Sequence, residues 1–337
     1  MKKLFTLVSL IALSYFAQAR ILTVSNVAGQ AAMFKVVQTA VDSAQVGDTV
    51  FVHASATDYA SISIKKRIVL LGEGGRPDWS SLKVRINNYI YVDSIAQVPG
   101  AGTIPVSGTV INGIHTDYVS IMNSVKGLIV KNCFIGGNIN TTGSGHIFVN
   151  NYIGWYINGA STNVLCMNNF FAKLSGEVNI ADVTNWTISN NIFSGAFSGT
   201  SCTVVNNIFL GANAIGSTNT SNSFSKNLQV GTDLPIGNYT GQALFTTFTE
   251  TISASMPTNE FVTKKFTFKA GSPGIAGGTD GKDVGIRGGQ YPWPAGKFLN
   301  GDPGLPKVQS IEVQNAVLAP GATLKVNLKA KSASTKQ

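Results

Sequence analysis

The chain has 337 residues, of which 44% are hydrophobic, so it is long enough to bury a large core. Only 12% of its residues are charged, against about 25% in an ordinary soluble domain, which excludes a coiled coil and a charged disordered chain. The formal net charge is +9, yet Asn, Ser and Thr supply most of the polar side chains. Neutral side chains suit closely stacked strands, where charged neighbours would repel one another, and we therefore predict an all-β fold.

Residues 1–19 are predicted to be a secretory signal peptide. Lys2 and Lys3 precede an apolar run from Leu4 to Phe16, and Ala17-Gln18-Ala19 fits an A-x-A cleavage site. The run is shorter than the ~20 apolar residues that span a bilayer, and no other stretch approaches that length. We expect a mature chain that begins at Arg20 and has no transmembrane segment, located in the periplasm, at the cell surface or outside the cell.

A short motif recurs through the centre of the chain: an apolar stretch, one or two Asn, then a second apolar pair. If the second Asn-type position is taken as the mark, successive marks are 19, 18, 22, 16 and 20 residues apart. The marks are Asn132, Asn151, Asn169, Asn191, Asn207 and Asn227. An imperfect period near nineteen is typical of a solenoid. The apolar runs have only three to five residues, rich in Val, Ile and Phe, so they predict strands rather than helices, and the frame of leucine-rich repeats is absent. Once helical and leucine-rich repeats are excluded, the predicted solenoid is a right-handed parallel β-helix with one coil per repeat.

Each marked Asn is expected to adopt the left-handed torsions of a tight bend, because Asn tolerates them better than other non-glycine residues. Stacked amides can then hydrogen-bond along the column as an asparagine ladder. Two apolar columns are predicted to face inward, three residues before and two residues after the mark. They contain Ile129, Phe148, Cys166, Ile188, Val204 and Phe224, and Phe134, Ile153, Phe171, Phe193, Phe209 and Gln229.

These Asn-marked coils resemble the pectin-lyase-like right-handed parallel β-helix superfamily. VGDTVFVHASATDY (46–59) and ISIKKRIVLLGEG (62–74) are similar to the opening of many such proteins. FTFKAGSPGIAGG (266–278) with DVGIRGG (283–289) resembles a shortened closing segment of bacterial secreted β-helix proteins. The resemblance covers roughly residues 30–290 and implies the fold. It implies no single activity, because the superfamily includes lyases, hydrolases, isomerases, adhesins and proteins of unknown role.

The ends of the solenoid need covers, because an open coil exposes sheet edges. Residues 31–44 place Phe34, Val37, Ala40 and Val41 at helical spacing, which predicts a short capping helix. Residues 310–318 and 323–330, joined by the turn at 319–322, predict a C-terminal β-hairpin. The expected organisation is a signal peptide (1–19), a β-helix with its caps (20–304), and a hairpin with a basic tail (305–337).

Residues suited to catalysis are sparse. The only close acidic pair in the repeat region is Glu177 and Asp182, preceded by Lys173, and the hydrolase patterns of the family are absent. These three residues are weak catalytic candidates, with a solvated loop as the alternative. No metal site is predicted: Cys133, Cys166, Cys202 and the three His lack ligand spacing, which favours buried free thiols. No cofactor is expected, and Ca²⁺ enters only if the chain is a lyase.

Aromatic residues suggest a binding function rather than a catalytic one. Trp155 and Tyr156 are adjacent, and two adjacent rings on a strand cannot both point inward, so at least one is expected to face solvent. Exposed rings can stack against sugars, with neutral amides as hydrogen-bond partners. The candidate amides are Asn138, Asn140, Asn158 and Asn179. Packing of the rings between loops is the alternative.

Two functions follow from these observations. The first is a secreted, non-catalytic β-helix that binds polysaccharide or cell-surface glycan, or serves a structural surface role. The second is a divergent polysaccharide lyase or glycoside hydrolase acting on acidic polysaccharide. Nucleic acid is excluded as a partner because the central region has almost no Lys or Arg to follow a phosphate backbone. The oligomeric state is left open.

Overall fold

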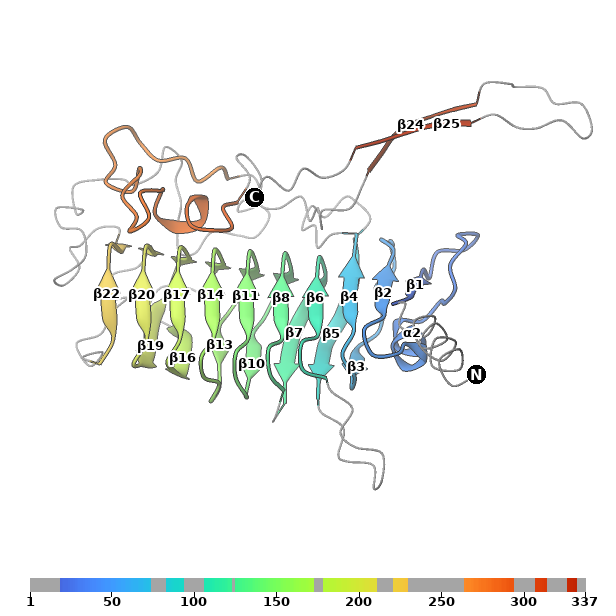
Figure 1. The fold of residues 1–337 in the computed structure, drawn as a ribbon, viewed down its shortest axis with the longest axis horizontal. Helices are drawn as coiled ribbons and strands as arrows, with labels where there is room; N and C mark the ends of the chain where they lie inside the picture. The colour runs from blue at the N-terminus through green and yellow to red at the C-terminus, as the bar shows by residue number, and fades with distance from the viewer. Residues whose placement is uncertain are drawn as a thin grey trace, which may run out of the picture.

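The computed structural model describes residues 19–73, 83–93, 106–122, 125–172, 178–210, 221–229 and 264–293, and the backbone of 307–313 and 326–331. Ten parallel strands stack in order along one side of a parallel β-helix (Figure 1). This first sheet contains β1 (Ile21–Val24), β2 (Thr49–Val52), β4 (Val69–Gly72), β6 (Val110–Asn112), β8 (Ile129–Lys131), β11 (Ile147–Val149), β14 (Leu165–Met167), β17 (Thr187–Ser189), β20 (Thr203–Val205) and β22 (Ser223–Ser225). Each strand pairs with its counterpart in the neighbouring coils, so the all-β class and the parallel β-helix are confirmed.

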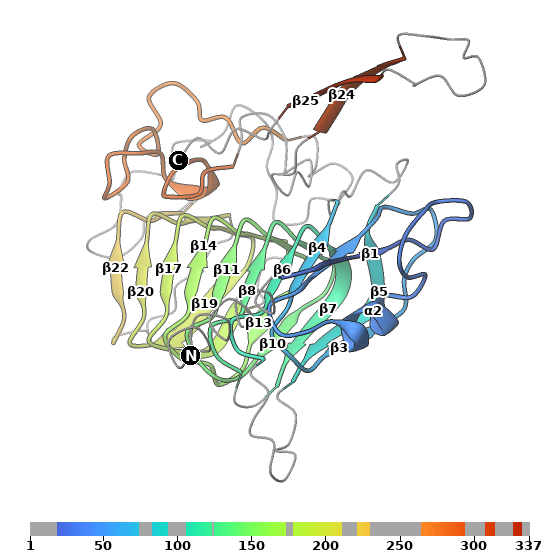
Figure 2. The same cartoon turned by 45° about the vertical axis from the view of Figure 1, so that its right-hand side comes forward.

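A second sheet of thirteen strands closes the coils, and Figure 2 shows its long strands across the coil from the first sheet. It begins with β3 (Ile62–Ile64), β5 (Arg85–Val92) and β7 (His115–Ile121). From β7 it divides into two arms, because the first residues of β7 pair with β9 and the last with β10. Arm A contains β10 (Ile139–Thr141), β13 (Ile157–Asn158), β16 (Val178–Thr184) and β19 (Ala196–Thr200). Arm B contains β9 (Phe134–Ile135), β12 (Tyr152–Ile153), β15 (Phe170–Phe171), β18 (Ile192–Phe193), β21 (Ile208–Phe209) and β23 (Leu228–Gln229).

In the coil of β12 and β13, the corner between the two arms requires glycine. A Cβ on Gly154 would lie 2.0 Å from the carbonyl oxygen of Gly136 in the coil before it. The chain therefore turns here with its backbone packed directly on the backbone of the neighbouring coil, and no side chain fits between them.

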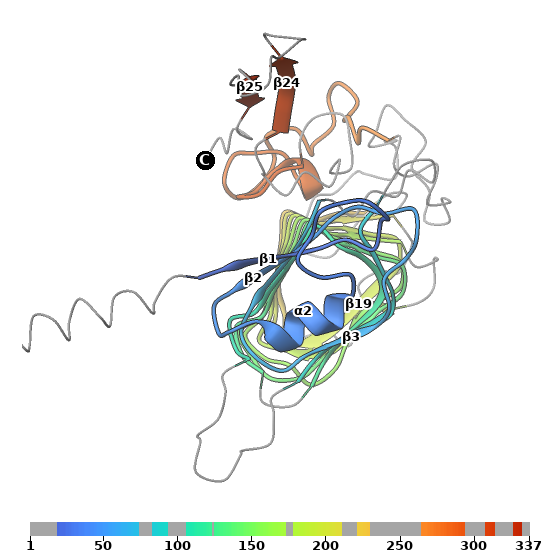
Figure 3. The same ribbon diagram turned by 90° about the vertical axis from the view of Figure 1, so that its right-hand side faces the viewer.

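Helix α2 (Val37–Ser43) lies across the open end of the first coil, as Figure 3 shows. Val37, Ala40 and Val41 are buried against the core, which confirms the predicted capping helix. Gln38 fixes the helix to β3, since its side chain accepts a hydrogen bond from the backbone N–H of Ser63 and donates one to the Ser63 carbonyl. Phe34 lies before the helix and is bridged to Val24 of β1 instead.

The interior of the coils is a stack of like side chains. Phe171 and Phe193 lie 4.6 Å apart between ring centroids, and Phe193 and Phe209 lie 5.1 Å apart, both pairs stacked. Cys133, Cys166 and Cys202 are buried free thiols, as predicted. Burial raises the pKa of the Cys133 thiol to about 12. The apolar columns supply the dominant favourable term for folding, because their area is removed from water.

The predicted register is wrong by one residue in the first marked coil. Sheet pairing aligns Lys131 with Val149, so the counterpart of Asn132 is Asn150 and the counterpart of Asn151 is Cys133. The inward residues of this coil are accordingly Val130 and Ile135, in place of Ile129 and Phe134. The physical reason is that the motif of this coil, Lys131-Asn132-Cys133, contains a single Asn, which takes the bend position rather than the inward one.

The remaining marks, Asn151 to Asn227, point into the coil and are fully buried. The Nδ2 of Asn151 donates to Oδ1 of Asn169 (3.0 Å), and the same contact joins Asn169 to Asn191, Asn191 to Asn207 and Asn207 to Asn227 (3.0–3.1 Å). Each Nδ2 also donates to a backbone carbonyl of the coil before it, as from Asn169 to Phe148 (2.8 Å). The amides therefore satisfy one another inside an apolar core.

The left-handed bend lies at Asn132 itself in the first marked coil, as predicted, and at the residue before the mark in the other five coils, which corrects the torsion predicted for those five marks. Positive φ angles of 53–58° occur at Asn132, Asn150, Asn168, Asn190, Asn206 and Lys226. Three of these residues hold a C-terminal segment, residues 264–293, which we name the strap. Asn168 donates to the carbonyls of Ile286 and Gly288, Asn190 to those of Asp283 and Gly285, and Asn206 to the Thr279 hydroxyl.

The strap lies along the side of the last coils (Figure 1). Its buried residues Phe266, Phe268, Val284, Ile286 and Trp293 form a second hydrophobic cluster with the outward residues of arm B. Those outward residues are Phe134, Tyr152, Phe170, Ile192, Ile208 and Leu228. Gly285 makes the approach possible, because it has φ 74° and an added Cβ would lie 2.6 Å from Ile208. The 3-10 turn η2 (Gly285–Arg287) is part of the strap.

The C-terminal hairpin is confirmed, with different strand limits. β24 (Lys307–Val313) and β25 (Val326–Lys331) pair antiparallel as a separate two-stranded sheet. The predicted turn at 319–322 lies outside the described residues.

Candidate functional site

One outer surface of the second sheet runs across β5, β7, β10, β13 and β16. Ile90, Val119, Ile139, Ile157 and Ile180 share one inward register position and are buried. The residues on either side of this position form two outward rows. One row contains Tyr91, Ser120, Asn140, Asn158 and Ala181, and the other contains Tyr89, Tyr118, Asn138, Tyr156 and Asn179. We name these two rows, with Trp155, the aromatic–amide face.

Three tyrosines form one end of this face. The ring of Tyr89 stacks on Tyr91 (5.0 Å between centroids) and on Tyr118 (4.7 Å). Tyr118 lies against Gly137 of the next coil, where a Cβ would come within 2.4 Å of its ring. Tyr91 is 39% exposed and so presents its ring to solvent. The sequence analysis missed these residues, although Tyr89 and Tyr91 stand two apart in an alternating strand and must share a face.

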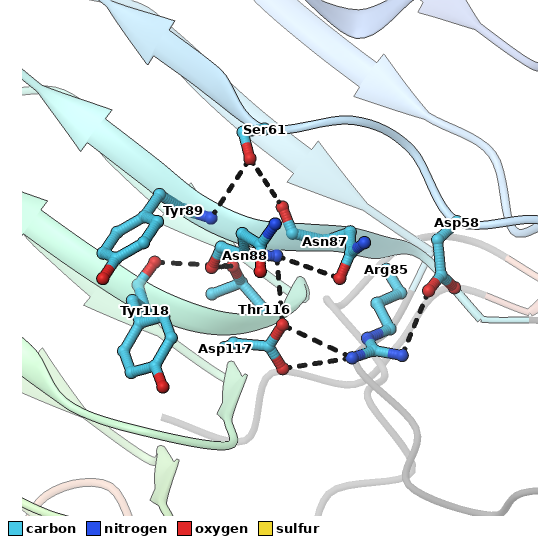
Figure 4. Close-up of polar contacts among 9 residues, drawn as sticks. All are labelled: Asp58, Ser61, Arg85, Asn87, Asn88, Tyr89, Thr116, Asp117 and Tyr118. Carbon is cyan, nitrogen blue, oxygen red and sulfur yellow. Dashed lines mark hydrogen bonds and ion pairs between the residues drawn. The ribbon is translucent and has the colours of Figure 1, made fainter.

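A charged cluster holds the corner of β5 and β7 beside the tyrosines (Figure 4). The guanidinium of Arg85 donates to Asp58 (3.0 Å) and to both carboxylate oxygens of Asp117 (3.1 and 3.4 Å). Asp117 also accepts the backbone N–H of Asn88 (3.0 Å), which has φ 60° at a register shift in β5. The Thr116 hydroxyl donates to the Asn88 carbonyl (3.2 Å). The charge of Arg85 is therefore balanced by two carboxylates, one of which, that of Asp117, also fixes the bulge.

His115 lies under this cluster and is 3% exposed. Its ring meets Phe134 edge-on, with 4.6 Å between centroids. Burial, together with the positive charges of Arg85 and Lys83, lowers the pKa of His115 to about 3. His115 is therefore neutral at physiological pH and is unsuited to donate a proton as a catalytic imidazolium.

His146 is also buried, and its role is structural. The backbone N–H of Leu128 donates to its Nδ1 (3.2 Å), so the ring hydrogen is on Nε2 and points to the Thr142 carbonyl (2.8 Å). Burial lowers the pKa of His146. Both ring nitrogens are used within the chain, which leaves neither for a ligand.

Trp155 and Tyr156 form the other end of the aromatic–amide face. Trp155 is 50% exposed, and Tyr156 is half-buried, with 6.5 Å between the ring centroids. The prediction that at least one of these rings faces solvent is thus confirmed. The backbone N–H of Trp155 donates to the carbonyl of Gly137 (2.9 Å), the residue that Tyr118 covers, so one glycine connects the two aromatic groups.

The four candidate amides differ in accessibility. Asn140 is exposed and Asn158 is half-buried, on adjacent strands in register. Asn138 is 6% exposed and donates its Nδ2 to Asn140 (2.7 Å). Asn179 is fully buried; it donates to the Trp155 carbonyl and accepts the N–H of Gly195. Asn140 and Asn158 can therefore meet a ligand directly, Asn138 orients Asn140, and Asn179 supports the corner that carries Trp155.

Of the three weak catalytic candidates, the structure describes only Asp182. Lys173 and Glu177 lie outside the described residues. Asp182 is exposed in β16 and has φ 58°. In the part of the chain that the structure describes, no group of three or more His, Cys, Asp or Glu is arranged to hold a metal ion.

Comparison of the chain with models of known protein families, with curated proteins and with solved structures found no match. Among the helices of the described residues, none has the length and apolar character needed to cross a membrane.

Proposed function

We propose that this chain is an exported, non-catalytic parallel β-helix protein whose aromatic–amide face binds a polysaccharide. The observation that carries the proposal is the pair of outward rows across five successive strands, which contain tyrosine, serine and asparagine side chains and lie beside the exposed ring of Trp155. Successive rungs are about 4.8 Å apart, so the row from Tyr91 to Asn158 extends over roughly 14 Å. A ligand that repeats along its length suits a surface that does the same.

The chemistry of the face favours a neutral sugar chain. Exposed rings offer apolar surface for the C–H faces of sugars, and the amides and hydroxyls between them offer hydrogen bonds. The guanidinium beside the tyrosines, that of Arg85, is already bound by Asp58 and Asp117. An anionic polysaccharide is bound most strongly by positively charged side chains. It would therefore need Lys or Arg side chains on the face that are not already paired with carboxylates, as Arg85 is.

We also propose that the chain is a distant member of the pectin-lyase-like superfamily and that residues 1–19 are removed on export. The stacked coils, the inward column of amides and the helical cover of the first coil support the family relationship. The basic, apolar and small-residue order of residues 1–19 supports export. The face would then meet polysaccharide in the periplasm, at the cell surface or in the medium.

The proposal is tested by binding the mature protein to an array of neutral and acidic polysaccharides, followed by affinity electrophoresis of variants on the best ligand. Tyr91→Ala and Trp155→Ala should each weaken binding about 3- to 10-fold, the effect of losing one stacking contact. Tyr291→Ala is the matched control, because Tyr291 is 41% exposed but belongs to the strap. It should bind like the unchanged protein.

Absence of binding to any polysaccharide would overturn the proposal, as would equal loss in Tyr291→Ala. Preference for acidic chains would contradict the neutral ligand. Release of unsaturated or reducing ends, abolished in Lys173→Ala, Glu177→Ala or Asp182→Asn, would instead favour the lyase or hydrolase alternative, since a lost acid or base costs about 10²–10⁴-fold.

A further inference from the structure

A buried carboxylate lies at the start of the first coil. Asp48 is 2% exposed, in the turn before β2, and both of its oxygens are fully engaged. Its Oδ1 accepts the backbone N–H of Arg20 (2.9 Å), and its Oδ2 accepts Nε and Nη2 of Arg20 (3.0 and 2.7 Å) and the N–H of Gln45 (2.8 Å). These donors lower the pKa of Asp48 despite the opposing effect of burial. Asp48 is thus a charged group whose main partner is a single residue, Arg20.

The backbone nitrogen of Arg20 is held at this carboxylate by the sheet. The Arg20 carbonyl accepts the N–H of Thr49 (2.8 Å), and the next residue, Ile21, pairs in register with Thr49. Arg20 therefore lies immediately before β1, at the first position that the sheet holds in place. It directly follows the A-x-A motif of residues 17–19. Its nitrogen stays beside Asp48 whether or not a residue precedes it.

We propose that cleavage of the Ala19–Arg20 bond creates an α-ammonium on Arg20 that binds Asp48 and locks the first coil of the mature protein. Hydrolysis adds water across the amide, leaving a carboxylate on Ala19 and an amino group on Arg20. An unperturbed α-amino group has a pKa of about 7.7–8.0, so it carries a proton at neutral pH. A neutral N–H donor at 2.9 Å from a buried carboxylate becomes a charged one, and charge-assisted hydrogen bonds are roughly twice as strong.

The surrounding groups reinforce this assignment. Arg20 Nη2 reaches the Ser43 carbonyl at the end of α2 (3.3 Å). From the β3–β4 turn, Lys66 donates to the carbonyls of Asp42 and Ala44 (2.8 and 2.9 Å). The Arg20–Asp48 pair, which the new ammonium would strengthen, therefore connects β1, the end of α2 and the turn before β2, the three pieces that close this end of the solenoid. The charged groups at the nitrogen are Asp48 and the Arg20 guanidinium, and Asp42 and Lys66 are the charged residues of the neighbouring helix end and turn. The proposal rests on the expected removal of residues 1–19 and is independent of glycan binding.

The test compares two purified proteins, one beginning at Arg20 and one carrying a single extra Gly before Arg20. Binding to Asp48 raises the folded-state pKa of the ammonium above its unfolded value. Its stabilisation is therefore complete below about pH 7.7 and is lost as the pH rises through the folded-state value. The protein that begins at Arg20 should have an unfolding constant about 5- to 10-fold smaller at pH 6.5, and the difference should vanish well above pH 10.

Asp48→Asn should abolish the difference between the two forms. If that variant does not fold, the rate of acylation of the α-amine in the unchanged protein gives a second measurement, since the bound amine should react several-fold more slowly in the folded state than in denaturant. Equal unfolding constants for the two forms across the pH range would overturn the proposal. So would an exported protein whose mass shows a first residue other than Arg20.

Discussion

At the scale of single residues, the two Asn of each Asn-Asn pair perform opposite tasks. The first, such as Asn168, adopts left-handed torsions and turns its amide outward to the strap. The second, such as Asn169, turns its amide inward to the neighbouring coils. The sequence analysis combined both tasks in one residue, because spacing alone does not distinguish the bend from the inward position when both are Asn.

The two tasks can be separated by substitution. Asn169→Val removes the acceptor of the Asn151 N–H and one donor to the Phe148 carbonyl in the core, so we expect a loss of about 2–3 kcal/mol in unfolding free energy. Asn168→Gly keeps the left-handed torsion and loses only the strap contacts, at about 1 kcal/mol. Asn158→Val, half-buried in β13, is the control and should change little. Denaturant unfolding measures all three, and equal values for Asn169→Val and the control would contradict the inward role.

His115 gives the protein a pH dependence of known sign. In the unfolded chain it binds a proton below about pH 6.5, whereas in the folded protein its pKa is about 3, so the unfolded state binds more protons between these values. Stability should therefore fall as the pH drops from 6.5 towards 5, by at most about 1.4 kcal/mol per unit. His115→Phe should reduce this slope in pH-dependent melting, and the part that remains belongs to His146, whose pKa is also lowered by burial. Phe134→Leu, which alters the same packing without a titrating group, should keep it.

At the scale of elements, the strap shows what periodicity leaves out. The coils could be predicted because short apolar runs recur near a nineteen-residue period. The strap has no repeat, and only its resemblance to a family closing segment suggested that it ends the fold. It contacts residues more than 70 positions earlier in the chain, such as Asn206 from Thr279, and such pairing has no local signal.

A matched pair of isoleucines tests whether the strap packs as described. Ile286 is 1% exposed within the second hydrophobic cluster, so Ile286→Ala should cost about 2–5 kcal/mol. Ile275 is 47% exposed in the same strap, and Ile275→Ala should cost less than about 0.5 kcal/mol. Denaturant unfolding followed by tryptophan fluorescence checks both. Similar small losses in both variants would mean that the strap does not bury arm B in solution.

At the scale of the whole molecule, the sequence predicted the architecture better than the aromatic–amide face. Trp155, Tyr156, Asn140 and Asn158 were found from their types and neighbours. Tyr91 and the tyrosines beside it were missed, because their place next to those amides depends on lateral alignment of coils. Coil lengths vary between 16 and 22 residues, so an error of one residue moves a side chain from outside to inside.

The strap also has a consequence for how the chain can vary in length. Duplicating a coil before β11 would add one rung and disturb only its two neighbours, because coils interact with adjacent coils alone. Under the strap, the same duplication would separate Asn168 from Asn206 by a further rung of about 4.8 Å, while Gly288 and Thr279 would stay the same chain length apart. The number of coils is thus free to change in the first half of the solenoid. In the second half, the constant length of residues 264–293 fixes the number of coils.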